Sequence, residues 1–501
     1  MRRFKQEALL FEKRSKNVLS DCSAPSRESA KPTDKSFLVL FFKKEPLAFL
    51  LALLLAGPAL ADENTDLDMI PTGVNEAPAT PPPAAVARDR IAIETAGSMG
   101  ALRGGMVVPQ PGATPARYQL RTSLDGRWQW DLGHDVSATL SNRISVFARD
   151  GQVVGEGRTA SNDLREAYVT WEAAARSYLE VGRINLRNGV ALGFNPTDFF
   201  RARSAVDQAS ADPSALRENR LGTAMVRAQH IADWGTLSLA YAPRLYDPTR
   251  LGQAATAPLD PHFDRTNATE RMLATLHVDI GDVAPELLLL KDGERTRIGG
   301  NISAPIGQRV VAYAEWSGGA AQSLIAEAVA YGIRTGTLPL GVPVLPPSGT
   351  GARFSNDFAA GFSWTGDSKL TVNVEYLFHE AGLSRTDWRR WYALGHASPA
   401  LAGEMWYLRG YAADQQMPSA RQQLFLRGNL PDAIARDIDL TALSFIDLDD
   451  GSAMAQISST WNIDRQWTAG AYLTGNFGPP RSEHGSLKNA ASATLQVQRF
   501  F

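Results

Sequence analysis

The chain has 501 residues, of which 44% are hydrophobic and 21% charged, and its formal net charge is -2. This balance excludes a disordered polymer and gives no basic surplus for nucleic-acid binding, so no nucleic-acid partner is expected. After residue 62 there is no run of about 18 apolar residues, which a transmembrane helix requires. Any membrane span must therefore be made of strands.

The N-terminal part predicts export from the cytoplasm. Lys43 and Lys44 precede a leucine-rich run at 47–56, and an Ala-Leu-Ala sequence follows at 59–61. Charged, apolar and small residues in this order are typical of a secretory signal peptide, here cleaved after Ala61, while a short buried helix is the alternative. We predict that residues 1–61 are an N-terminal extension plus this signal peptide. Residues 1–40 fit poorly in front of a signal and indicate an over-extended start codon.

The segment after the cleavage site predicts a linker. Residues 62–87 are rich in proline and alanine and cannot pack into a core, so we expect a periplasmic linker there. The only cysteine, Cys22, precedes the cleavage site. The mature chain therefore has no disulfide, thiolate nucleophile or lipid-anchor acceptor. Residues 88–501 remain for the folded domain.

From residue 88 onward, apolar and polar residues alternate with the period of two that is typical of strands. The clearest case is 369–379, where Val372, Val374 and Tyr376 alternate with Asn373 and Glu375. One face of this strand suits lipid and the other suits water. Strands are predicted at 89–97, 118–130, 136–149, 164–172, 178–183, 221–230, 235–242, 269–280, 285–291, 295–303, 308–318, 354–364, 369–379, 422–429, 437–448, 453–461, 467–476 and 489–501.

The connections between these strands alternate in length. Short turns near 131–135, 173–177, 231–234, 281–284, 304–307, 365–368 and 462–466 contrast with long excursions at 184–220, 243–268, 319–353 and 380–421. Membrane barrels have short periplasmic turns and long outer loops, whereas a soluble sandwich needs no such asymmetry. We therefore predict an all-β fold, a transmembrane antiparallel β-barrel of about 18 strands, with 16 as the alternative. If the C-terminus is periplasmic, the long loops lie outside only when one more strand precedes residue 118. We therefore include the weakly patterned strand at 89–97.

Tryptophans flank the predicted short turns, where an aromatic girdle at the membrane interface belongs. Aromatic residues are also common at strand ends in general, which is the alternative explanation. The girdle candidates are Trp130, Trp171, Trp234, Trp364, Trp461 and Trp467.

The last predicted strand alternates through Ala493, Leu495 and Val497 and ends on Phe501. A terminal strand of this kind resembles the Gram-negative outer-membrane β-barrel proteins of the porin type, and the resemblance implies that Phe501 belongs to the assembly signal. Arg499 departs from the pattern, because an apolar residue is usual at that position.

The resemblance implies a location in the cell outer membrane, with lipid and lipopolysaccharide around the barrel and the barrel-assembly machinery as a partner. It also implies that the long excursion at 184–220 folds inward and narrows a pore, the alternative being an external loop with ordinary surface charges. The residues that this implies at the constriction are Arg183, Arg187, Asp198, Arg201, Arg203 and Asp207.

The sequence lacks the zinc-hydrolase and serine-hydrolase motifs and a complete calcium-binding loop. The seven histidines show no zinc-binding spacing and there is no G-x-S-x-G sequence. The sequence DLDDGS at 447–452 begins like a calcium-binding loop, but Ser458 stands where the twelfth-position glutamate belongs. We therefore expect no catalytic site, no metal and no cofactor.

Two functions are compatible with this sequence. The first is a porin-like channel for passive or facilitated diffusion of small solutes. In such a channel Glu375 faces the lumen, where replacement by arginine should be tolerated, and Val374 faces lipid, where arginine should destabilise the protein. The second is a barrel without transport, either a sheath around a periplasmic partner or an outer-membrane hydrolase. The sequence leaves the solute, the charge selectivity, gating and the oligomeric state undetermined. The lumen-facing candidates are Tyr168, Thr170, Arg227, Thr371, Asn373, Glu375 and His379.

Overall fold

The computed structural model describes residues 90–110, 116–150, 159–251, 260–338 and 351–501. The predicted signal peptide and the proline-rich linker lie outside the described residues. Among the described residues, no helix is both long and apolar enough to cross a membrane.

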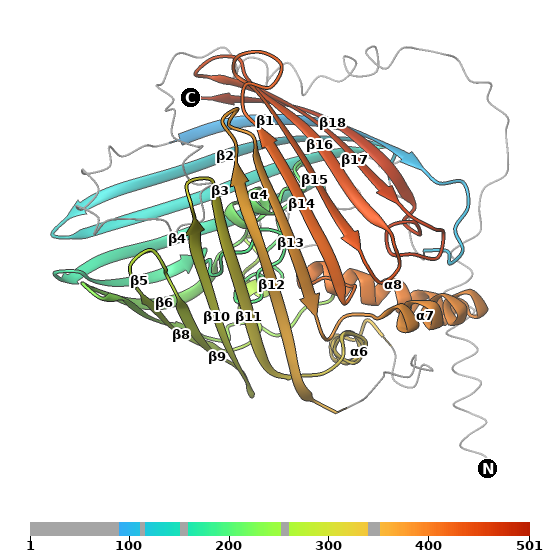
Figure 1. Ribbon diagram of the computed structural model, residues 1–501, viewed down its shortest axis with the longest axis horizontal. Coiled ribbons are helices and arrows are strands. Elements are labelled where there is room, and N and C mark those ends of the chain that lie inside the picture. Colours follow the sequence, from blue (N-terminus) through green and yellow to red (C-terminus); the bar gives the residue numbers. More distant parts are fainter. Residues whose placement is uncertain (1–89, 111–115, 151–158, 252–259, 339–350) are drawn as a thin grey trace. The chain divides into compact units, whose positions relative to one another are not determined.

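Eighteen antiparallel strands form one closed ring (Figure 1). Each strand pairs with the next one in the sequence, and β1 closes the ring by pairing with β18, with Ala92 opposite Phe500. Closure leaves both sides of every described strand paired, which removes the exposed edges of an open sheet. The predicted 18-stranded antiparallel barrel is confirmed, and so is the weak first strand that the loop parity required.

The bounds of the strands are β1 Arg90–Leu102, β2 Tyr118–Gly133, β3 Val136–Arg149, β4 Ala160–Ala174, β5 Ser177–Ile184, β6 Thr223–Ala232, β7 Gly235–Ala242, β8 Arg271–Val278, β9 Glu286–Asp292, β10 Arg295–Ile306, β11 Val310–Ala321, β12 Arg353–Thr365, β13 Thr371–His379, β14 Gln422–Leu430, β15 Ile438–Asp447, β16 Ala453–Asn462, β17 Trp467–Phe477 and β18 Asn489–Phe500.

Side chains alternate between the two faces of the ring, as the period of two requires. On β13, Asn373 and Glu375 are buried inside while Tyr376 is 36% exposed outside. This polar interior is the reverse of a soluble barrel, whose core is apolar. Large apolar residues that are exposed on the strands include Leu237, Leu239, Leu289, Ile457, Leu473 and Leu495.

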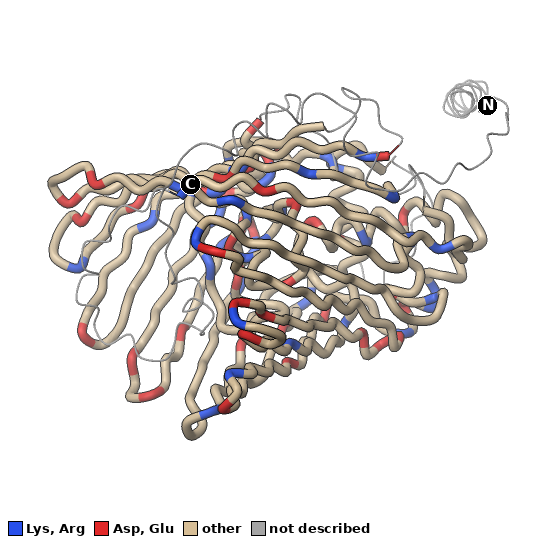
Figure 2. Tube along the Cα trace, turned by 90° about the horizontal axis from the view of Figure 1, so that it is seen from above, with Lys and Arg blue, Asp and Glu red and all other residues tan. Residues whose placement is uncertain are grey.

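The two ends of the ring differ in their connections. Short turns lie at the end where the chain reaches Phe501, which we call the turn end, and the long excursions lie at the opposite end, the loop end. In Figure 2 acidic residues, in red, mark many of the turns. The predicted tryptophans stand beside the turns of the turn end, where Trp130, Trp171, Trp234 and Trp461 are exposed and Trp364 and Trp467 half-buried.

The long excursions contain helices, which strand patterning alone did not predict. They are α4 Pro213–Glu218, α5 Phe263–Thr266, α6 Leu324–Arg334, α7 Arg385–Ala397 and α8 Pro399–Asp414. A capping box between Ser384 and Asp387 begins α7, and Pro399 occupies the first turn of α8, where its missing N–H costs nothing. The helices α6, α7 and α8 pack through a shared apolar cluster that includes Leu324, Trp388 and Met405. This helix cluster stands at the loop end (Figure 1).

Candidate functional site

The connection between β5 and β6, residues 185–222, lies inside the ring of strands, and we call it the inward loop. Figure 1 shows its helix α4 behind the strands of the wall. Two wall carboxylates hold its backbone: Glu315 on β11 and Glu375 on β13, which are 1% and 0% exposed. They accept hydrogen bonds from backbone N–H groups that an irregular segment cannot satisfy by itself.

Glu375 binds the first part of the inward loop. Its Oε1 accepts a hydrogen bond of 2.6 Å from the N–H of Leu192, and its Oε2 accepts one of 2.7 Å from the N–H of Gly193. The hydroxyl of Tyr313 donates to the same Oε1 at 2.6 Å. Three donors converge on this buried carboxyl group, so it is a firm anchor for the loop. The structure contradicts the expectation that arginine is tolerated at position 375, because Glu375 is fully engaged.

Glu315 binds the adjoining part of the loop. Its Oε2 accepts from the N–H of Ala191 at 3.1 Å, and its Oε1 accepts from the N–H and the hydroxyl of Thr197 at 2.6 and 2.7 Å. Gly189 has a φ of +91°, and a Cβ there would lie 2.4 Å from Oε1 of Glu315. The backbone conformation and the close approach therefore both require glycine at this position.

Apolar side chains complete the attachment of the inward loop to the wall. Phe194 is buried in a cluster with Leu377 and Phe425. Phe200 is buried in a second cluster with Met225, and Phe199 packs against its edge. Full burial of such a side chain contributes about 1.5 to 3 kcal/mol, so packing adds to the hydrogen bonds.

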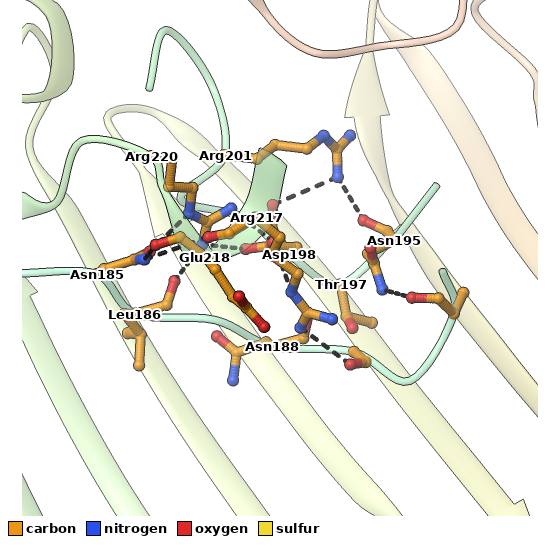
Figure 3. Close-up of polar contacts among 12 residues, drawn as sticks. Asn185, Leu186, Asn188, Asn195, Thr197, Asp198, Arg201, Arg217, Glu218 and Arg220 are labelled. Atoms are coloured by element: carbon orange, nitrogen blue, oxygen red, sulfur yellow. Dashed lines mark hydrogen bonds and ion pairs between the residues drawn. The ribbon is translucent and has the colours of Figure 1, made fainter. Parts of the chain in front are cut away.

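A buried ion pair stabilises the loop internally. The Nη1 and Nη2 atoms of Arg220 donate to the two carboxylate oxygens of Asp198 at 2.7 and 2.9 Å, and Nε of Arg217 lies 3.5 Å from Oδ2 (Figure 3). Burial alone would raise the pKa of Asp198, but the Arg220 and Arg217 guanidinium groups hold that pKa below its ordinary value. Asp198 is therefore ionised at neutral pH and ties α4 to the middle of the loop.

A cavity of about 380 Å³ lies between the inward loop, the wall and the helix cluster, and we call it the arginine cavity. Eight arginines and four carboxylates line it, so its formal charge is strongly positive. Its charged lining residues are Arg201, Arg203, Arg244, Arg265, Arg271, Arg295, Arg297 and Arg334, with Asp198, Asp292, Glu327 and Asp357.

The carboxylates neutralise only part of this charge. Nη2 of Arg297 lies 2.5 Å from Oδ2 of Asp357, and Nη1 of Arg295 lies 2.5 Å from Oε1 of Glu327. Arg201 instead donates to backbone carbonyls and forms no ion pair among the described residues. Burial lowers its pKa to about 10, so it still carries its charge at neutral pH. The cavity is therefore suited to a small anion.

A second cavity of about 240 Å³ lies nearer the turn end. The start of the inward loop, with Arg187, forms one side, and inward residues of β6 to β9 form the other. Arg227 here pairs with Glu180 at 3.1 Å. Because each cavity is bordered by the inward loop, the loop divides the interior between the two ends of the barrel.

One histidine and carboxylate pair lies in the arginine cavity. Nδ1 of His379 is 2.7 Å from Oδ1 of Asp357, and Nε2 of His379 has no hydrogen-bond partner among the described residues. Ser355 lines the same cavity, but no hydrogen bond joins its hydroxyl to His379 in the described part of the chain. The pair therefore lacks the linked nucleophile of a hydrolase.

A second group of potential ligands lies in the excursion after β7. Asp260, His262 and Asp264 place one ligand atom each within 4.8 Å of one another. However, Thr249 donates to Asp264 at 2.9 Å, and Nη1 of Arg183 donates to the carbonyl of Pro261 at 2.6 Å. A guanidinium group beside the cluster opposes binding of a metal cation.

The structure divides the predicted constriction residues among three settings. Asp198, Arg201 and Arg203 line the arginine cavity, and Arg187 lines the second cavity. Arg183 and Asp207 line neither: Arg183 donates to the carbonyl of Gly222 at 2.9 Å, and Asp207 pairs with Arg121 at 3.0 Å.

The predicted lumen residues all have inward positions in the strand register. Thr139 lies opposite Tyr168 and Ser137 opposite Thr170, while Thr371, Asn373, Glu375 and His379 share one face of β13. Of these residues, His379 lines the arginine cavity and Arg227 lines the second cavity. Glu375 holds the loop, and Tyr168 packs against the cluster around Phe200.

Sequence reasoning missed most of the arginine cavity and Glu315 of the loop anchor, and it named Glu375 only as a lumen-facing residue. Arg271, Arg295 and Arg297 stand at inward positions near the loop end of their strands, which the period of two could have shown. No local signal shows that they face Arg201, which is distant in the sequence. The anchoring role of Glu315 has no sequence signal either.

No family model and no curated protein sequence matches the chain. Solved structures are similar to it at low identity. They include OccK8 (OprE) of Pseudomonas aeruginosa, with 11% identity and a TM-score of 0.47, covering 83% of this chain and 98% of that one. OccAB3 of Acinetobacter baumannii has 9% identity and a TM-score of 0.46, covering 83% and 99%. A mutant of the Rh. blastica porin has 10% identity and a TM-score of 0.38, covering 83% and 100%.

Proposed function

We propose that the protein is an outer-membrane channel through which small solutes diffuse, with the inward loop as its constriction and the arginine cavity as its charge filter. The single observation that carries this proposal is a cationic cavity inside a closed barrel, bordered by a loop that is anchored to the wall.

The outer surface of the barrel supports a membrane location. Exposed apolar residues such as Leu239 and Leu473 cover the strands, and exposed tryptophans such as Trp171 stand beside the short turns. An apolar band flanked by aromatic residues is the surface that a barrel presents to lipid. In this proposal the turn end is periplasmic and the loop end external, and lipid and lipopolysaccharide surround the wall.

The end of the chain fits the proposed route of insertion. The N–H of Phe501 donates to the carbonyl of Ile91 at 2.9 Å, which extends the seam where β1 and β18 close the ring. The Arg499 guanidinium lies 4.8 Å from the centre of the Phe501 ring and 5.4 Å from that of Trp467. Export through the signal peptide, followed by recognition of this last strand by the assembly machinery, belongs to the same proposal.

The charge of the arginine cavity supports a preference for anionic solutes. Fixed positive charges in a narrow low-dielectric passage raise the local concentration of anions and repel cations. The proposal includes no enzymatic role, because among the described residues no nucleophile is hydrogen-bonded to the His379 and Asp357 pair.

The test is the current through single channels in a planar lipid bilayer. The wild-type protein is expected to conduct with a reversal potential that favours anions in a salt gradient. Arg334→Glu, at an exposed position of the arginine cavity, should shift the reversal potential toward cations. Arg309→Glu, which changes an exposed arginine at the turn end, is the matched control and should leave it unchanged. Absence of channel current from correctly folded protein would overturn the proposal.

A further inference from the structure

Helix α7 presents a cationic face to solvent. Its other face is buried in the helix cluster and carries Trp388, Trp391 and Tyr392. Because these positions follow the helical period, Arg389 and Arg390 lie on the exposed side. Neither arginine has a hydrogen-bond partner or an ion pair among the described residues. Asp387, the acidic residue of α7, accepts hydrogen bonds in the capping box at the start of the helix.

Arg481 extends this face from a neighbouring connection. It lies between β17 and β18, is exposed and also has no partner in the described part of the chain. The carbonyl of Ser482 accepts a hydrogen bond of 2.6 Å from the Tyr392 hydroxyl of α7, so Arg481 lies beside the helix. The exposed charged side chains of α7 and of this connection are all arginines. We call Arg389, Arg390 and Arg481 the cationic surface.

The cationic surface lies outside the path proposed for solutes. The arginine cavity is bordered by α6 and α8, and no residue of α7, which the structure describes in full, lines this cavity or the second one. The surface stands at the loop end with the rest of the helix cluster (Figure 1). In the proposed orientation this end is external, where lipopolysaccharide surrounds the wall. The charge is therefore placed to meet the headgroups of the outer leaflet.

We propose that the cationic surface binds phosphate groups of lipopolysaccharide. This inference rests on the proposed function only for the orientation of the barrel, with the loop end outside. A guanidinium group can donate two parallel N–H bonds to phosphate oxygens, which makes arginine well suited to phosphate. Basic residues clustered on an amphipathic helix also attract anionic lipid surfaces, and each residue adds a similar increment to the binding free energy. Three arginines without internal partners therefore match a headgroup with more than one phosphate.

The packing of α7 determines how the lipid is held. A cationic amphipathic helix that lies on a membrane buries its apolar face at the acyl boundary. In α7 that face packs within the helix cluster, where Trp388 is 1% and Trp391 2% exposed, and it cannot reach acyl chains. Recognition is then electrostatic, and bound lipopolysaccharide attaches the helix cluster to the membrane surface. Binding should weaken when added salt screens the charges.

The experiment titrates the whole detergent-solubilised protein with lipopolysaccharide and with the same lipopolysaccharide after removal of its phosphates. The wild-type protein should bind the phosphorylated form about tenfold more tightly, and this difference should shrink in about 1 M salt. In the triple variant Arg389→Gln, Arg390→Gln, Arg481→Gln the two forms should bind with similar affinity. The three side chains are exposed, so the variant should fold and melt at the wild-type temperature.

The matched control is Arg309→Gln, Arg436→Gln, Arg465→Gln, which removes three exposed arginines from turn-end hairpins and should keep the preference for phosphate. Equal binding of both forms by the wild type would overturn the proposal, and so would a preference that survives in the first triple variant. Phosphatidylglycerol that competes as well as lipopolysaccharide would also overturn it, since the surface then accepts any anionic lipid. The titration needs no channel current, so a protein that passes this test without conducting contradicts the proposed function alone.

Discussion

The carboxylate of Glu375, on the wall of the barrel, accepts a 2.6 Å hydrogen bond from the backbone N–H of Leu192, on the inward loop. These residues are far apart in the sequence, and their contact determines where the loop crosses the interior. Glu315 on β11, two strands from β13, likewise accepts a hydrogen bond from a backbone N–H of the inward loop, that of Thr197. Two buried glutamates therefore set the position of the proposed constriction.

Replacement of Glu375 by glutamine should loosen this anchor. The amide NH₂ group cannot accept a hydrogen bond, so one loop N–H loses its partner, and we expect a loss of about 1 to 3 kcal/mol in unfolding free energy. Single-channel recordings should also show a noisier open current, because the loop gains freedom. Glu294→Gln, in the exposed hairpin between β9 and β10, should show neither effect. Equal noise in both variants would contradict an anchoring role.

Loss of the Asp198 carboxylate should destabilise the protein through the buried Arg220 that remains. We expect Asp198→Asn to cost about 3 to 5 kcal/mol, the range for one partner removed from a buried ion pair. Asp207→Asn in the same loop should cost less than about 1 kcal/mol, because its carboxylate is half-exposed. Denaturant titrations of both variants compare the two pairs directly.

The ion pair between Asp198 and Arg220 should make the stability of the protein depend on pH. The pKa of Asp198 is lower in the folded protein than in the unfolded chain, so the unfolded chain takes up the proton first as the pH falls. The stabilisation from the Asp198 carboxylate is complete above its pKa in the unfolded chain, about 3.9. This stabilisation is lost as the pH falls through the pKa of Asp198 in the folded protein. The difference in stability between wild type and Asp198→Asn should therefore shrink below about pH 4. A constant difference down to strong acid would exclude this linkage.

Arginine substitutions on the two faces of the wall should show which face meets lipid and which face meets the water-filled lumen. Leu239 is 54% exposed on the outer face of β7, and Thr275 lines the second cavity from β8. Leu239→Arg should cost about 2 to 4 kcal/mol for folding into lipid, whereas Thr275→Arg has water and space around it and should be tolerated. Folding titrations into lipid vesicles measure both. Equal damage on the two faces would indicate that the outer face does not meet lipid.

Deletion of residues 195–212 should widen the passage. Arg220→Gln must accompany the deletion, because Arg220 would otherwise remain buried without Asp198. Single-channel conductance should then increase, since the segment that crosses the interior is gone. The full-length Asp198→Asn, Arg220→Gln variant is the control for the lost ion pair and should not show this increase. If the deletion leaves the conductance unchanged, the inward loop is not the constriction.

The sequence by itself determined the barrel. Period-two alternation identified all eighteen strands. In a barrel wall with water on one side and an apolar environment on the other, polar and apolar side chains must alternate along each strand. The loop lengths placed the turns at one end, and their parity required β1 before its pairing with β18 was known.

Only the tertiary structure decided what fills the barrel. A strand pattern shows that Glu315 and Glu375 face inward but gives no sign that both accept hydrogen bonds from the same loop. The arginine cavity draws its charges from the inward loop, from β8 and β10 and from α6, and the sequence separation of Arg201, Arg271 and Arg334 hides this convergence. The physical reason is that alternation is a local property of one strand, whereas side chains that share a cavity are brought together by register and closure of the whole ring.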